Sequence, residues 1–329
     1  MTISFSLGAN SDILRAQSDT LAYGERVRGF MENEPQVWFF EGRADDVVVI
    51  DMLTLPNSGL DGVLRLYGVD GEMLLEDDDG GHNTNPRIGP VRLPADGRYE
   101  ISVSAYSGRG EYILQLTGIE NMVTLALEKS LTLTLDDEHM AAHLWLENVP
   151  PGILRLEALP ENDSAPLISI FNSDGTVMNQ SAYRKPGVIE PFIVQGGEQY
   201  IIILDMAFPQ RDTAQTVHFR LMPSTIELLT AGSVVEGRVS TTGAPVHFFE
   251  ARSGEQVTLE VRLLDGEISP SIYIRSVNGE HFLFSSSAVT VLQTIVTLRI
   301  PADGLYSIEI SDGSYSGESG HYRLHFDSP

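Results

Sequence analysis

The 329-residue chain has a formal charge of −25, no cysteine, and 42% hydrophobic residues. This length exceeds the size at which a single hydrophobic core stops growing, so we expect two or three folded domains. The acidic field repels phosphate and argues against nucleic acid as a partner, and the lack of cysteine excludes disulfides, thiolate metal sites and cysteine nucleophiles.

The N-terminal segment Thr2–Asn10 alternates apolar and polar residues as a strand does. We expect it to pair within its own first domain; the alternative is that it caps a sheet edge of a neighbouring subunit by strand addition. The start of the chain lacks the basic and apolar runs of a signal peptide, so the protein is either cytoplasmic or begins where a leader was removed. No apolar run is long enough to span a membrane.

Strand patterns dominate the chain, and only residues 9–18 and 136–143 could hold a short helix. The first strands are short apolar or alternating runs separated by Gly, Asp and Pro clusters; they include Val47–Leu53, Val63–Tyr67, Tyr99–Val103 and Tyr112–Leu116. This pattern is typical of an antiparallel β-sandwich.

The acidic loop Glu76–Asn85, EDDDGGHNTN, is the sharpest local feature of the sequence. Consecutive carboxylates with an amide and glycines can collect the hard oxygen ligands that Ca²⁺ prefers. We therefore predict one calcium site; its ligands would be Asp61, Asp77, Asp78, Asp79 and Asn83. The alternative is a solvated hairpin loop. The corresponding loops at 180–187 and 285–291 contain no carboxylate, so we expect one ion per chain.

His139 and His143 lie four residues apart in DDEHMAAH, which would place both rings on one face of a helix. The segment lacks the H-E-x-x-H pattern and aligns with a loop between strands in the other units. We expect it to be a surface loop. His247, His321 and His325 lie in strand patterns and are interpreted as ordinary strand residues.

A turn recurs three times at a spacing of about one hundred residues. LPADGRYEISV at Leu93–Val103 and IPADGLYSIEI at Ile300–Ile310 are closely similar, and VQGGEQYIIIL at Val194–Leu204 is the same turn without its proline. Aromatic opening strands, a middle hairpin and a closing strand keep the same order around each turn. This repetition predicts an all-β protein of three tandem antiparallel jelly-roll-like β-sandwich domains, at 1–120, 121–223 and 224–329.

Aromatic residues recur in register in the opening strands, and this repetition favours the core over a sugar-stacking or peptide-stacking face. They are Trp38, Phe39, Phe40, Trp145, Phe248 and Phe249. By contrast, Tyr106, Tyr183 and Tyr315 fall in expected loops, where an exposed ring would be more informative.

Taken in order, the motifs of the first unit resemble the bacterial pre-peptidase C-terminal domain. They are Glu25–Gly29, Trp38–Phe40, Leu64–Gly71, Asp77–Asp79, Pro94–Tyr99 and Gly110–Leu114. The resemblance covers residues 21–118 and 226–326 well, and residues 123–223 only in strand order. The family is similar to the collagen-binding domains of clostridial collagenases, and related domains carry calcium near such loops. The resemblance implies an accessory role beside secreted enzymes, but no peptidase is attached here.

No G-x-S-x-G elbow, phosphate-binding loop or evident carboxylate pair marks a catalytic site, so we predict that the protein is not an enzyme. The sequence favours an exported binding or surface-structural protein, whose partner is a protein, a polysaccharide or another copy of itself. One alternative is a module that targets collagen-like or polysaccharide substrates. The other is a self-assembling filament or envelope subunit, and a hydrolase is a distant third.

Overall fold

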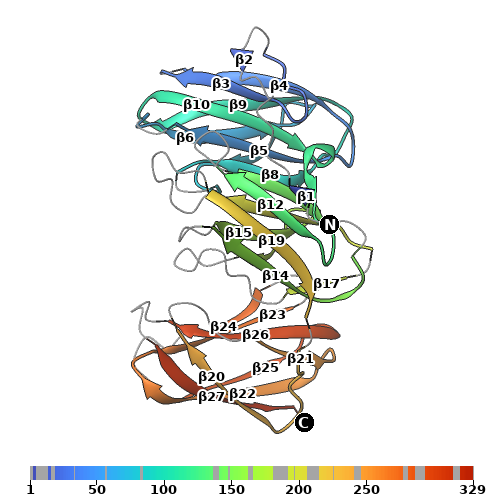
Figure 1. Cartoon of the computed structure of the whole chain (residues 1–329), viewed down its shortest axis with the longest axis vertical. Coiled ribbons are helices and arrows are strands. Elements are labelled where there is room, and N and C mark those ends of the chain that lie inside the picture. Colours follow the sequence, from blue (N-terminus) through green and yellow to red (C-terminus); the bar gives the residue numbers. More distant parts are fainter. Residues whose placement is uncertain are drawn as a thin grey trace. The chain divides into compact units, whose positions relative to one another are not determined.

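The computed structural model describes most of the chain (Figure 1). The described residues are 3–4, 14–15, 19–32, 34–55, 58–81, 84–135, 141–146, 149–161, 166–180, 192–195, 197–205, 215–224, 226–240, 246–276, 281–285, 293–313 and 319–328. They form two compact units: unit 1 comprises Met1–Val149, Glu157–Val177 and Gly197–Leu221, and unit 2 comprises Pro150–Leu156, Met178–Gly196 and Met222–Pro329. Each unit is described by itself below.

The predicted fold class is confirmed, because the described residues form six sheets whose longer strands pair antiparallel. The one helix among them is the short 3₁₀ helix η1 (Ile119–Asn121). No helix in this part of the chain is long and apolar enough to cross a membrane. The sheets follow one another in pairs along the sequence. The domain boundaries near residues 120 and 224 stay a prediction.

The first pair of sheets lies in unit 1. One sheet has the order β2-β3-β10-β5-β8, with strands β2 (Leu14–Arg15), β3 (Arg26–Met31), β10 (Gly110–Gly118), β5 (Val47–Thr54) and β8 (Arg87–Arg92). The other has the order β4-β9-β6-β7, with strands β4 (Gln36–Gly42), β9 (Gly97–Ser107), β6 (Asp61–Tyr67) and β7 (Met73–Asp77). Apolar side chains from both sheets form one buried cluster, as alternating strands of a sandwich require.

The second pair of sheets follows in sequence. One has the order β11-β13-β18-β15-β16, with strands β11 (Val123–Thr124), β13 (Ala141–Leu146), β18 (Tyr200–Asp205), β15 (Leu167–Asn172) and β16 (Val177–Gln180). The other has the order β1-β12-β19-β14-β17, with strands β1 (Ile3–Ser4), β12 (Ser130–Leu135), β19 (Gln215–Pro223), β14 (Gly152–Pro160) and β17 (Phe192–Val194).

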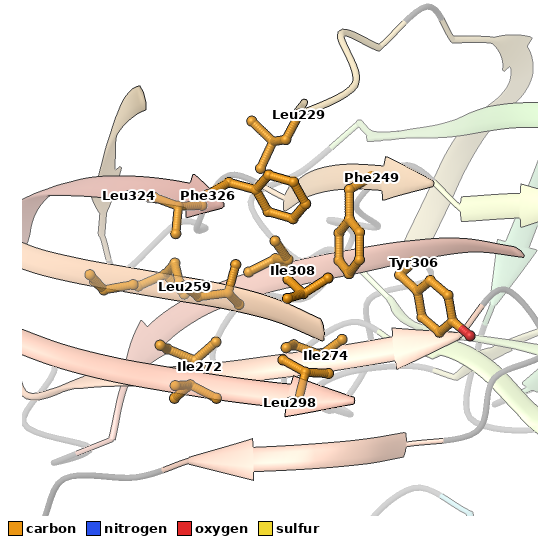
Figure 2. Close-up of a cluster of buried hydrophobic side chains, with 14 of the residues drawn as sticks. Leu229, Phe249, Leu259, Ile272, Ile274, Leu298, Tyr306, Ile308, Leu324 and Phe326 are labelled. Atoms are coloured by element: carbon orange, nitrogen blue, oxygen red, sulfur yellow. The ribbon is translucent and has the colours of Figure 1, made fainter. Parts of the chain in front are cut away.

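The third pair of sheets lies in unit 2. One has the order β20-β27-β22-β25, with strands β20 (Ser233–Val239), β27 (Gly320–Asp327), β22 (Gln256–Gly266) and β25 (Gln293–Arg299). The other has the order β21-β26-β23-β24, with strands β21 (Val246–Ala251), β26 (Gly304–Asp312), β23 (Pro270–Ser276) and β24 (His281–Ser285). Their facing side chains form one buried apolar cluster (Figure 2), whose described members lie within residues 229–326.

Strand β5 of unit 1 is buried on both faces, which explains its nearly unbroken apolar sequence VVVIDMLT. Val48, Ile50 and Met52 point into the first sandwich. Val47 and Val49 point the other way and pack with residues of the second pair of sheets, including Trp145, Ile201 and Ile203. Residues on either side of position 120 therefore share a buried apolar layer.

A tyrosine hydroxyl closes the Pro-Ala-Asp-Gly-x-Tyr turn in both copies that keep it. Tyr99 Oη donates to the Ala95 carbonyl over 2.7 Å, and Tyr306 Oη donates to the Ala302 carbonyl over 2.5 Å. In the middle copy, where the proline is missing, the buried Tyr200 instead donates to the Glu198 carboxylate at 3.0 Å. The recurring tyrosine thus stabilises the turn that precedes it through a hydrogen bond from its hydroxyl.

The glycine that ends the Glu25–Gly29 motif, and its counterpart Gly237 in the third repeat, make room for the tyrosine of the closing strand. A Cβ added to Gly29 would lie 2.4 Å from the ring of Tyr112, and one added to Gly237 would lie 2.4 Å from the Tyr322 hydroxyl oxygen. Both tyrosines are fully buried. Two motifs that are far apart in each repeat are therefore one packing contact.

The start of the chain pairs with strands of both the first and the second pair of sheets. Leu14–Arg15, which follows the predicted strand Thr2–Asn10, pairs in parallel with β3. Ile3–Ser4 pairs in parallel with β12 of the second pair of sheets, so the expectation of pairing within the first domain is wrong for these residues. The segments that could have held short helices contribute strands instead, Leu14–Arg15 and Ala141–Leu146.

Candidate functional site

The acidic loop follows β7, and its first carboxylate already has backbone partners. Asp77 Oδ2 accepts hydrogen bonds from the Gly80 amide at 2.6 Å and the Arg87 amide at 2.8 Å. These bonds hold the two ends of the loop together, which is the Asp-Gly turn chemistry expected of a hairpin loop. Asp78 and Asp79 are exposed.

The remaining predicted calcium ligands are only partly placed. Asp61 begins β6, where its partner on β9 is Ser107 and a register shift follows. Asn83 lies outside the described residues. The neighbouring Asn85 is buried, and its Oδ1 accepts from the Thr54 amide and hydroxyl, so this amide braces the loop. Among the described residues no group of three or more His, Asp or Glu side chains is arranged to hold a metal ion.

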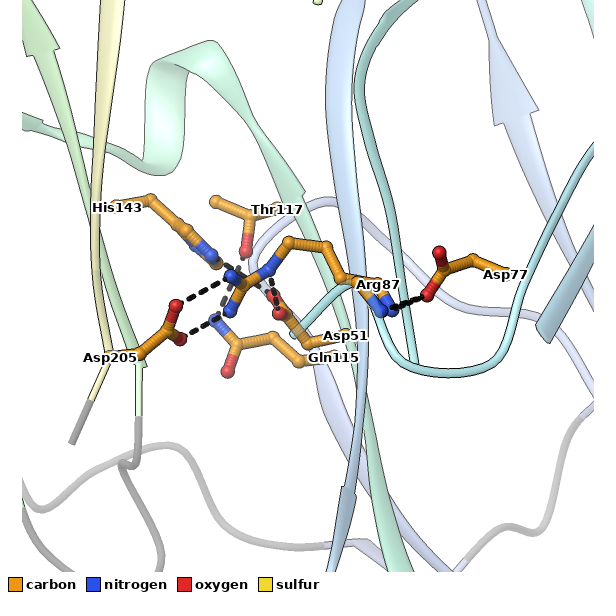
Figure 3. Close-up of polar contacts among 8 residues, drawn as sticks. Asp51, Asp77, Arg87, Gln115, Thr117, His143 and Asp205 are labelled. Atoms are coloured by element: carbon orange, nitrogen blue, oxygen red, sulfur yellow. Dashed lines mark hydrogen bonds and ion pairs between the residues drawn. The ribbon is translucent and has the colours of Figure 1, made fainter. Parts of the chain in front are cut away.

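Within unit 1, a buried polar cluster lies between the sheet that contains β5 and β8 and the sheet that contains β13 and β18 (Figure 3). We call Asp51, Arg87, His143 and Asp205 the buried tetrad. Arg87 Nε donates to Asp51 Oδ1 at 2.6 Å, and its two terminal nitrogens donate to the two oxygens of Asp205 at 2.8 and 2.6 Å. His143 Nε2 lies 3.0 Å from Asp51 Oδ2, a contact that is an ion pair when the imidazole is protonated.

All four side chains are less than 10% exposed, which makes their charges strongly interdependent. Burial by itself would raise the pKa of Asp51, but the Arg87 guanidinium and His143 outweigh it and hold this pKa well below its usual range. Burial would lower the pKa of Arg87, and Asp205 and Asp51 outweigh that effect and raise it. Arg87 therefore stays charged between its two carboxylates.

The tetrad corrects one sequence-based expectation. His143 does not lie in a surface loop; it is a buried residue of β13, and its main-chain partner is Ile203. Its companion His139 lies outside the described residues. His247 and His321 are strand residues, as expected: His247 Nε2 lies 2.8 Å from the Tyr322 hydroxyl, and His321 Nδ1 lies 2.7 Å from Asp265.

Sequence reasoning missed the tetrad, although a signal for it was present. Asp51 interrupts the apolar run of β5, and Asp205 ends the apolar run Tyr200–Asp205. A carboxylate inside a strand that is buried on both sides requires a cationic partner, because an unpaired buried charge is very costly. The sequence did not show that Arg87 would supply the partner for both.

Other titratable groups with shifted pKa values also serve packing. Burial raises the pKa of Tyr112 to about 12; its hydroxyl accepts from Trp38 Nε1 at 3.2 Å and donates to Gln36 Oε1 at 2.5 Å. Burial lowers the pKa of His247, which meets the corresponding Tyr322 in unit 2. Both contacts involve the buried tyrosine of a closing strand, Tyr112 of β10 or Tyr322 of β27.

Most of the strand aromatics are in the core, as predicted. Five of them are at most 5% exposed: Trp38, Phe40, Trp145, Phe248 and Phe249. Phe39 is partly exposed and carries the Arg98 guanidinium 3.8 Å above its ring. Tyr106 is 75% exposed at the end of β9. Tyr183 and Tyr315 lie outside the described residues.

Comparison with known proteins identifies no family. No family model matches the chain, and no curated protein matches it. Among solved structures, the chain aligns with "The Triple Jelly Roll Fold and Turret Assembly in an Archaeal Virus" at 9% identity, covering 91% of this chain and 83% of that one, with a TM-score of 0.25.

A second match is "Life in the extremes: atomic structure of Sulfolobus Turreted Icosahedral Virus", at 9% identity, 91% and 84% coverage and a TM-score of 0.23. A third contains the M60 catalytic domain with the CBM51-1 and CBM51-2 domains from Clostridium perfringens ZmpB, at 8% identity, 93% and 34% coverage and a TM-score of 0.22. These scores are too low to support an argument about function.

Proposed function

We propose that this chain is a non-catalytic, exported binding or surface-structural protein built of three modules that resemble pre-peptidase C-terminal domains. The observation that supports it is the burial of β5 on both faces, with the tetrad in the same layer. Most of the strongly shifted titratable groups and motif residues described above support packing. Such a layer holds consecutive sandwiches as one body, which suits a protein that spaces or scaffolds.

The charge of −25 supports the same proposal. Strong negative charge favours solubility of a protein and repels nucleic acid and anionic lipid. The expected partners are therefore a protein, a polysaccharide or another copy of the chain.

The test is a screen of the full chain against generic ester, glycoside and peptide substrates, together with negative-stain images at rising protein concentration with and without calcium. We expect no turnover and discrete particles or assemblies. Turnover that scales with protein concentration and survives further purification would refute the non-catalytic role.

A targeting role is the second candidate, and the exposure of Tyr106 favours it. An exposed ring on a sheet can stack on a sugar or pack on a peptide. Binding isotherms with collagen peptides and soluble polysaccharides would test this role. We expect Tyr106→Ala to weaken any binding, with Tyr67→Ala on the adjacent β6 as the comparison variant; equal affinities for wild type and Tyr106→Ala would remove the candidate.

Calcium binding at the acidic loop remains part of the proposal. The two backbone hydrogen bonds described for Asp77 use its Oδ2, and Asp78 and Asp79 are exposed to solvent; Asp61 would complete the set of ligands together with Asn83. We expect calcium to raise the melting temperature of the wild type and not that of Asp78→Ala. An identical response in both proteins, or none in either, would leave the loop as a solvated turn.

A further inference from the structure

Three edge strands occupy the same position in the three sheet pairs. Each pairs with the strand that closes its repeat: β3 with β10, β12 with β19, and β20 with β27. The fifth residue of each closing strand lies opposite an apolar edge residue, Val27, Leu131 or Val235. These three edge residues are therefore equivalent.

The first eighteen residues, called the N-terminal segment from here on, contribute two described strands, β1 and β2, which cover two of these edges in the same register. Leu14 lies opposite Val27 on β3, and Ile3 lies opposite Leu131 on β12, and both pairings are parallel. One stretch of chain thus uses an apolar residue at the same equivalent position twice. A shared register on two independent edges indicates a preference of this segment for this kind of edge.

The third edge has no such cover among the described residues, because β20 is the terminal strand of its sheet. The three equivalent edge residues differ in burial in the same way. Val27 is 2% exposed and Leu131 is 4% exposed, whereas Val235 is only partly buried at the border of its core. Its neighbour Val234 is 56% exposed.

The charged residues of β20 leave this edge accessible. Glu236 pairs with Arg323 on β27 at 2.7 Å, and Arg238 donates to the Ser319 hydroxyl at 3.3 Å. Both side chains are thus directed toward the closing strand. Gly232 donates to the Phe326 carbonyl and the Ser233 amide donates to the Thr230 carbonyl, so Gly232 and Ser233 lie together opposite Phe326 as in a β-bulge. From Ser233 onward, alternate residues bond toward β27, and this alternation turns the N–H of Val234 outward.

We propose that the outer edge of β20 accepts the N-terminal segment of a second copy of this chain as an added parallel strand. β20 has seven residues, and the described residues of the segment pair with each of its own edges at two positions. Main-chain hydrogen bonds supply the affinity in such strand addition. Donor and acceptor are different surfaces, so the contact is heterologous and links copies in series. This inference rests on the proposed structural role and names its partner.

The test uses a fluorescent peptide of residues 1–18 and the full chain, with anisotropy as the readout, and sedimentation velocity of the unlabelled chain in parallel. Val234→Lys places a charge on the proposed edge, and Val234→Pro removes the outward N–H there while leaving the bonds toward β27. Ile295→Lys is the matched control, because Ile295 is 60% exposed on β25, the opposite edge of the same sheet.

We expect the peptide to bind wild type and Ile295→Lys equally, and both Val234 variants about tenfold or more weakly, as the loss of about 1.4 kcal/mol implies. Concentration-dependent sedimentation should disappear in the same two variants. Binding that is unchanged by both Val234 variants would mean exchange onto β3 or β12 and would overturn the inference. Absence of peptide binding would also overturn it, while the proposed non-catalytic role would fall only with turnover in the substrate screen.

Discussion

Arg87 is the residue at which the buried polar chemistry of unit 1 converges. Its guanidinium satisfies one carboxylate from β5 and another from β18, and its backbone amide donates to Asp77 of the acidic loop. One arginine lies between two buried carboxylates. Removing any of these three charges would leave another one buried without its partner, which is strongly destabilising. Single substitutions here should therefore have large effects.

Replacing Arg87 by alanine should lower the free energy of unfolding by about 3 to 5 kcal/mol, because Asp51 and Asp205 would be left buried without a cation. Arg323→Ala is the control: its pair with Glu236 is about half-exposed, and such pairs contribute about 0 to 1 kcal/mol. Urea unfolding of both variants measures the difference. Equal losses would show that the tetrad contributes no more than a surface pair.

The depressed pKa of Asp51 predicts acid sensitivity of a defined sign. A carboxyl group whose pKa is lowered by folding contributes stability above its ordinary pKa of 3.8, and this contribution is lost as the pH falls through the lower folded value. Asp51→Asn should have a lower free energy of unfolding at neutral pH than the wild type. Below about pH 4, its free energy of unfolding should also fall less steeply with decreasing pH, by up to about 1.4 kcal/mol per pH unit. Unfolding curves between pH 7 and pH 2 test this; parallel acid limbs would contradict it.

The recurring turn shows how a short motif works at the scale of strands. Asp96 Oδ1 accepts from the Ala44 amide at 2.8 Å, and Asp303 Oδ1 accepts from the Ser253 amide at 2.7 Å. In both copies the aspartate thus fastens the turn after β4 or β21 to the turn that precedes β9 or β26. The motif is repeated because the contact is repeated.

Asp96→Ala and Asp303→Ala should therefore destabilise the protein by similar amounts, about 0.5 to 2 kcal/mol each, since each leaves a backbone donor without its carboxylate acceptor. Asp70→Ala, at an exposed hairpin tip whose carboxylate accepts only from the nearby Glu72 amide, serves as a local control. Thermal unfolding gives the comparison. A large effect in one copy and none in the other would argue against equivalence of the two turns.

At the scale of the whole molecule, the first and third sheet pairs differ in whether residues outside the pair bury their apolar side chains. Among the described residues, the buried apolar cluster of the third sheet pair lies within 229–326. By contrast, Val47 and Val49 of β5 are buried by residues beyond position 120, such as Trp145 and Ile201. The first sandwich therefore depends on the second for part of its burial.

A fragment of residues 224–329 should fold alone with a cooperative transition, whereas residues 1–120 should aggregate or unfold more easily because one apolar face and Asp51 would be exposed. Residues 1–223 should restore the stability of the first part. Circular dichroism melts of the three fragments test this. A residues 1–120 fragment as stable as residues 224–329 would show that the shared layer contributes little.

The sequence alone determined the fold class, the threefold repetition and the core positions of the strand aromatics, because each depends on local alternation or on a motif that recurs in order. It placed Tyr106 in a loop, whereas the structure places this residue at the exposed end of β9. Only the tertiary structure showed that His143 and Asp51 belong together, that Arg87 pairs with Asp205, and that Ile3 lies on β12. These contacts join residues far apart in sequence across packed faces, and a single chain's pattern of polar and apolar residues does not specify which face packs on which.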